Sequence, residues 1–96
     1  MSGGHFNYAQ HHFHDIAEEI RRVIETNDST ALNQYGDHIG RGYDQSVIAK
    51  FKEAERICRL AYIYAQRVDW LLSCDDGEDN FAERLGKELS DFNKEV

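Results

Sequence analysis

The longest amphipathic pattern in the chain covers residues 46–73 and predicts one long α-helix. Its first apolar line recurs at intervals of four and three, which is the spacing of a single helix face. That line consists of Val47, Phe51, Ala54, Cys58, Ala61, Ala65, Val68 and Leu72. A second line on another side consists of Ile57, Leu60, Tyr64 and Leu71. Because a helix that is apolar on two sides must be covered on both, we expect its own chain or another copy to pack there.

Two shorter helices are predicted on either side of this long one. From about Tyr8 to Ile24, apolar residues recur at helical spacing, and the polar stretch that begins at Asn27 should end the first helix. The third helix, residues 78–93, has one apolar face made of Phe81, Leu85, Leu89 and Phe92. Residues 1–7 are expected to be an irregular lead-in. The pattern predicts a single helical domain over residues 1–96, an all-α, small antiparallel three-helix bundle with a long central helix at about 46–73.

The connections between the helices carry their own signals. The glycine-containing segment 28–45 should be a loop, with a helical turn around residues 31–35. Asp44 suits the N-cap of the long helix, since its carboxylate can accept a hydrogen bond from an amide of the first turn. The sequence Cys74-Asp75-Asp76-Gly77 should end that helix, and Asp76 with Asp79 resembles a capping box for the third helix.

Charge and chain length narrow the class of function. The 96 residues carry a formal charge of −7, and residues 69–96, with nine acids against three bases, account for −6 of it. Binding to nucleic acid depends on cations that neutralise phosphates, so direct nucleic acid binding is not expected. The sequence has no basic leader segment and no apolar run long enough to span a bilayer, which predicts a cytoplasmic protein that does not contact membranes.

The two cysteines are expected to be free thiols. Cys58 and Cys74 flank continuous helix, which would hold them roughly 20 Å or more apart, whereas a disulfide needs Cα atoms closer than about 7 Å. Cys58 lies within an apolar line, where a thiol is normally inert, and Cys74 is followed by two carboxylates and not by the cations that activate a thiol. No serine lies in a nucleophile motif either, so we expect no enzyme activity and no cofactor.

A line of cations and aromatic residues along the long helix is the main candidate for ligand binding. Lys52, Arg56, Arg59, Ile63, Gln66 and Trp70 share one face. Cations can hold phosphates and an aromatic ring can stack a base. This alternative function is a sponge for a nucleotide signal, with candidate ligand-binding residues Arg41, Lys52, Arg56, Arg59, Tyr62, Arg67 and Trp70. A solvated face, with Trp70 packed beneath the third helix, is the structural explanation of the same pattern.

Histidines near the N-terminus suggest a second alternative, a His-rich metal-binding protein. Four of the five histidines lie within residues 5–14. His11 and Asp15 share a helix face at i,i+4, as metal ligands often do, and His14 is a near neighbour. These three residues are weak candidates, because an exposed polar helix start explains the same residues.

Two stretches resemble a family of small uncharacterised proteins of bacteriophages and prophages. They are the opening MSGGHFNY and the block YAQRVDWLLSCDDGEDNF at residues 64–81. Many members of that family have glycine where this chain has Cys74, which leaves open whether the turn there has glycine geometry. The resemblance implies the cytoplasm of an infected bacterium as the setting. Small phage proteins of this kind often act against host defence, by blocking a protein or sequestering a signal nucleotide.

The first interpretation is therefore a small phage-type binding protein that acts by protein–protein interaction and is a candidate inhibitor of a host defence protein. The surplus apolar surface of the long helix favours a homo-oligomer, and the partner would be a host or phage protein. The acidic end supplies the candidate partner-binding residues Asp75, Asp76, Glu78 and Asp79.

Overall fold

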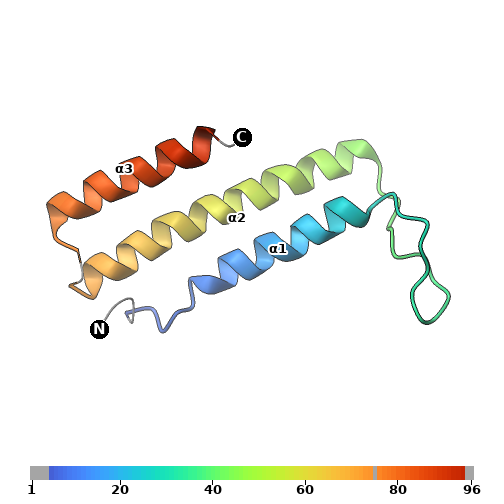
Figure 1. Cartoon of the computed structure of the whole chain (residues 1–96), viewed down its shortest axis with the longest axis horizontal. Coiled ribbons are helices and arrows are strands. Elements are labelled where there is room, and N and C mark those ends of the chain that lie inside the picture. The colour runs from blue at the N-terminus through green and yellow to red at the C-terminus, as the bar shows by residue number, and fades with distance from the viewer. Residues whose placement is uncertain (1–4, 75, 95–96) are drawn as a thin grey trace.

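Three α-helices account for the regular structure of the chain. In a computed structural model, which describes residues 5–74 and 76–94, they are α1 (His11–Thr26), α2 (Gln45–Leu72) and α3 (Glu78–Lys94). The prediction of an all-α, antiparallel three-helix bundle with a long central helix is confirmed (Figure 1). The bounds of α2 and α3 agree with the predicted ones to within one residue.

The three helices form an open, elongated layer with α2 in the middle. Helices α1 and α3 each pack against α2, and among the described residues they do not pack against each other (Figure 1). The extents are 53 × 27 × 15 Å and the radius of gyration is 17.3 Å, whereas a compact chain of this length has a value of roughly 12.5 Å. The packing of α1 and of α3 therefore depends on their separate contacts with α2.

Helix α1 begins three residues later than predicted. Asn7 and Tyr8 have φ values of 53° and 61°, a left-handed conformation that a continuing α-helix cannot contain. The turn that they form is tied to the far end of α2, because the backbone N–H of Phe6 donates to Oδ1 of Asp69 at 2.9 Å. Asp69 is fully buried there.

Polar contacts hold α1 against α2. Gln10 donates to Gln66 at 2.8 Å, and the hydroxyl of Tyr62 lies 3.1 Å from Nδ1 of His11. Ala17, with no exposed surface, allows the helices to approach closely. Only part of the apolar line of α1 lies in this contact: Ala17 is buried, and Ile20, Val23 and Ile24 are half-buried. Phe13 and Ile16 remain 39% and 49% exposed.

The loop between α1 and α2 is anchored by the buried Asn27. Its side-chain amide accepts from the backbone N–H of Tyr43 at 2.8 Å and donates to the Tyr43 carbonyl at 2.9 Å. The prediction of a helical turn around residues 31–35 is wrong. Leu32 and His38 instead form an isolated antiparallel bridge, closed by a turn in which Gly36 has a φ of 82°.

Both ends of α2 have specific caps. The Asp44 carboxylate accepts hydrogen bonds from the backbone N–H and the hydroxyl of Ser46, at 3.0 and 2.6 Å, so the predicted N-cap is confirmed. These bonds lower the pKa of Asp44, the hydroxyl of Ser46 contributing most. At the other end, Cys74 has a φ of 65° and donates its N–H to the Leu71 carbonyl at 3.1 Å. The turn thus has glycine geometry although the residue is cysteine.

A buried ion-pair cluster joins α2 to α3. The Asp76 carboxylate lies 3.3 Å from the guanidinium of Arg67 and 2.6 Å from that of Arg84, and Arg67 also lies 2.8 Å from Glu88. Asp76 is 6% exposed. The predicted capping-box role of Asp76 is therefore wrong, because its carboxylate is held by arginines. Glu78 and Asp79 lie in the first turn of α3, where acidic side chains interact favourably with the positive end of the helix dipole.

The hydrophobic core is very small. Ala17 and Ile48 are the buried hydrophobic residues of the described chain. The accessible surface is 6827 Å², whereas a folded monomer of this mass exposes roughly 5,700 Å². The elongated layer therefore exposes roughly 1,100 Å² more surface than a compact monomer, summed over the whole chain. No helix among the described residues has the length and apolar character needed to cross a membrane.

Candidate functional site

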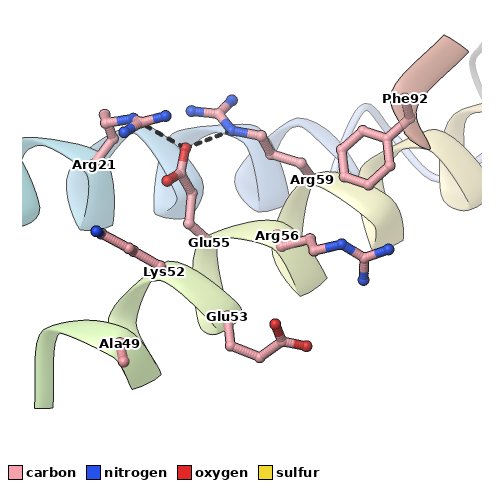
Figure 2. Close-up of a pocket in the computed structure, with 8 residues that line it drawn as sticks. All are labelled: Arg21, Ala49, Lys52, Glu53, Glu55, Arg56, Arg59 and Phe92. Carbon is pink, nitrogen blue, oxygen red and sulfur yellow. Dashed lines mark hydrogen bonds and ion pairs between the residues drawn. The ribbon is translucent and has the colours of Figure 1, made fainter. Parts of the chain in front are cut away.

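A cleft of about 590 Å³ runs along α2 between α1 and the end of α3 (Figure 2). We call it the basic cleft. Its charged lining consists of four cations, Arg21, Lys52, Arg56 and Arg59, and two carboxylates, Glu53 and Glu55, and the Phe92 ring and Ala49 complete it. Four cations against two carboxylates leave the cleft with a formal charge of +2, in a chain whose net charge is −7.

The carboxylate of Glu55 organises one wall of the basic cleft. Glu55 is buried on α2, and its Oε2 lies 2.8 Å from Nε of Arg59 and 3.3 Å from Nε of Arg21 on α1 (Figure 2). Arg59 also lies 3.7 Å from Glu18. These pairs hold two guanidinium groups in fixed positions, and they leave further N–H groups of both arginines free to contact a ligand.

Lys52 and Arg56 provide the cations without a carboxylate partner. Neither makes an ion pair within residues 5–74 and 76–94. Arg56 lies with its guanidinium carbon 5.6 Å from the centre of the Phe92 ring and donates a long hydrogen bond of 3.4 Å to Asn93. The end of α3 thus positions Arg56 over an aromatic ring (Figure 2).

The structure brings together some of the predicted ligand-binding residues and separates the others. Lys52, Arg56 and Arg59 line the basic cleft. Arg67 lies further along α2, stacked on Trp70 at 3.9 Å and paired with Asp76. Tyr62 faces α1, where it contacts His11. Arg41 lies in the loop, beside a second cleft of about 440 Å³ formed with residues 27–29, 38, 40 and 42.

Among the cleft residues that were not expected from the sequence, Arg21 and Phe92 come from helices other than α2. Arg21 lies outside the apolar line of its helix, and Phe92 belongs to the apolar face of its own helix. Their position depends on the register of α1 and of α3 along α2. In the sequence, Glu55 lies between Lys52 and Arg59, but its burial, which calls for a cationic partner from another helix, is visible only in the structure.

The predicted acidic partner surface is divided. Asp76 is buried and paired with Arg67 and Arg84. Glu78 and Asp79 are exposed at the start of α3. Asp75 lies outside the described residues. The two exposed acids of α3 remain the accessible part of this surface.

The histidines of α1 do not form a metal-ligand cluster within the described residues. His11 contacts the Tyr62 hydroxyl, and Nε2 of His14 lies 3.5 Å from Glu18. Within residues 5–74 and 76–94, no three or more His, Cys, Asp or Glu side chains are grouped so that they could hold a metal ion. Asp15 is exposed. Cys58 and Cys74 are free, as the sequence predicted.

Outside the lining of the basic cleft, α2 and α1 carry exposed apolar residues. Four of them lie on α2, namely Val47, Ile57, Tyr64 and Leu72, with exposed fractions of 39% to 53%, and Phe13 and Ile16 lie on α1. We call these six residues the apolar face.

Two of these residues, Ile16 on α1 and Val47 on α2, lie on the same side of the layer. Ile16 precedes the contact residue Ala17 by one position, and Val47 likewise precedes the buried Ile48. On any α-helix, moving back by one residue rotates the direction of the side chain by the same angle and in the same sense, seen from the N-terminus. Because α1 and α2 are antiparallel, equal turns seen from each N-terminus point to one side of the pair (Figure 1).

Comparison with protein-family models, with curated proteins and with solved structures finds no match to this chain.

Proposed function

We propose that this chain is a small protein-interaction module that pairs with a second copy of itself through the apolar face. The observation that carries the proposal is the uncovered surface of the three-helix layer. The whole chain exposes roughly 1,100 Å² more than a compact monomer, a surplus of the same order as the area of about 800 Å² that each partner buries in a standard protein interface. Pairing of two copies would cover the apolar face without leaving an edge for a third.

The chemistry of the apolar face fits a second copy of the same chain. Its six members carry no charge, and the exposed Lys50, seven residues before Ile57 on the same side of α2, would keep its ammonium group in water at the edge of the contact. Small residues, including Ala54, Cys58, Ala61 and Ala65, lie among the large ones along α2. They allow two α2 helices to approach closely. Each chain buries few hydrophobic residues of its own. Pairing of two chains should therefore contribute a large part of their stability.

The biological role that we propose is that of a phage-type protein that binds a host protein and inhibits it. Two features support this role: the sequence resemblance to small phage proteins, and an exposed acidic pair at Glu78 and Asp79 that self-pairing leaves accessible. In this proposal the homodimer presents two copies of that acidic surface.

Sedimentation or light scattering of the purified chain tests the self-pairing. We expect twice the mass of one chain, and we expect Ile57→Glu to dissociate the pair by placing a charge in an apolar interface. Leu32→Glu is the matched control, because Leu32 is 58% exposed and Ile57 53%, but Leu32 lies in the loop away from the apolar face. A wild-type chain that is a monomer at high micromolar concentration, or equal dissociation by both variants, overturns the proposal.

A further inference from the structure

The basic cleft holds more positive charge than its own carboxylates offset. Lys52 and Arg56 are one helical turn apart on α2 and have no ion-pair partner in the described chain. Arg21 and Arg59 are fixed nearby by Glu55. Unpaired cations close to one another repel, and a bound anion relieves that repulsion.

The aromatic component is supplied by a different helix. Phe92, on the last turn of α3, lines the cleft beside Arg56. Guanidinium groups and aromatic rings both offer flat faces on which a nucleobase can stack. The volume of about 590 Å³ lies within the range of small-molecule sites.

We propose that the basic cleft binds a mononucleotide, with the phosphate between Lys52 and Arg21 and the base beside Arg56 and Phe92. Glu55 is a positioning residue that orients Arg21 and Arg59. Glu53 also lines the cleft, and its carboxylate repels the phosphate. The phosphate is therefore expected to lie away from Glu53. Around α2, Lys52 and Arg59 point about 120–160° away from Ile57 and Tyr64, and Arg56 points about 80–100° away from them, so the basic cleft and these two apolar residues lie on different sides of the helix.

The spacing of residues along α2 supports the separation of the basic cleft from the apolar residues Ile57 and Tyr64. Residues 52, 56, 59 and 63 recur at intervals of four and three on one side. Ile57 and Tyr64 are seven residues apart on the other side and are 53% and 44% exposed. Ligand binding and self-pairing are therefore expected to occur independently, and the failure of one leaves the other intact.

Calorimetric titration at low salt tests the proposal, with the four nucleoside 5′-monophosphates, inorganic phosphate and adenosine as probes. We expect at least one nucleotide to bind ten times more tightly than either inorganic phosphate or adenosine. Equal affinity for a nucleotide and for inorganic phosphate overturns the base contact. Equal affinity for AMP and for adenosine overturns the phosphate contact. The absence of binding by all four nucleotides overturns the proposal as a whole.

Two lysines on α2 provide a matched pair of variants. Lys52→Glu should weaken nucleotide binding at least tenfold, whereas Lys50→Glu, with the same change of charge two residues away and outside the cleft lining, should change it less than threefold. Equal effects of the two variants would mean that only the overall charge matters, which contradicts a built site. Phe92→Leu should remove the preference for nucleotide over inorganic phosphate. Circular dichroism of each variant checks that the helices persist.

Discussion

The guanidinium of Arg67 lies 3.3 Å from the carboxylate of Asp76, and both residues are 6% exposed where α2 turns toward α3. Arg67 also stacks on Trp70 at 3.9 Å. This contact, together with Arg84 and Glu88, joins α3 to the rest of the molecule. Since α3 has no fully buried residue, the polar cluster contributes much of the specificity of its docking.

Asp76→Ala should therefore destabilise the chain by about 3 kcal/mol or more, because it leaves two arginines without their shared carboxylate. Urea unfolding followed by the fluorescence of Trp70, the single tryptophan, measures the change. Hydrogen exchange should show loss of protection along α3. Asp79→Ala serves as the control and should cost less than about 1 kcal/mol, the contribution of an exposed first-turn acid. If the two losses are similar, the cluster does not hold α3.

Cys74→Gly should stabilise the protein. Cys74 has a φ of 65°, and a side chain in this left-handed region costs about 1–2 kcal/mol. Glycine removes that cost but loses more chain entropy on folding, by about 0.5–1 kcal/mol. We expect a net gain of about 0.5–1 kcal/mol, measured by thermal unfolding. Cys74→Ala removes the thiol and retains the strain, so a gain in that variant as well would argue against the backbone explanation.

Gly40→Ala should be destabilising by about 1–3 kcal/mol, the usual range for overpacking. A Cβ at Gly40 would lie 2.6 Å from the backbone carbonyl oxygens of Thr26, Asn27 and Ser29, which are rigid neighbours. Gly86→Ala provides the contrast, because nothing lies within 4 Å of a Cβ there and alanine favours the helix. Thermal unfolding of the two variants should shift in opposite directions. A neutral Gly40→Ala would mean that the loop does not close on α1.

The N-cap of α2 should make stability depend on pH. The folded-state pKa of Asp44 is lowered by its bonds to Ser46, so its contribution is present above the unfolded pKa of about 3.9 and is lost as pH falls through the folded value. Asp44→Ala should lower the melting temperature by a few degrees at pH 7, and the difference from wild type should shrink below about pH 4.

Asp44→Asn keeps a capping oxygen but does not titrate, and it is the matched variant for this experiment. It should lie close to wild type at pH 7 and lose less stability on acidification. Circular dichroism between pH 7 and pH 3 follows all three proteins. A difference between wild type and Asp44→Ala that is constant over this range would show that the carboxylate charge plays no part.

The local pattern determined the elements of this fold. Apolar residues at intervals of three and four gave α2 and α3 to within one residue, and a single carboxylate at Asp44 marked where α2 begins. Such signals depend on neighbours one helical turn away, so they can be read along the chain. The basic line of Lys52, Arg56 and Arg59 was visible for the same reason.

The tertiary structure decided which of these lines face each other. Along the apolar line of α1, Ala17 is buried whereas Phe13 stays exposed, and Gln10 and His11 add polar contacts to α2. Arg21 and Phe92 reached the basic cleft, and Asp76 became a buried ion-pair partner, only through the register of three helices. Register depends on side chains far apart in the sequence, whose pairings have no repeating period along it.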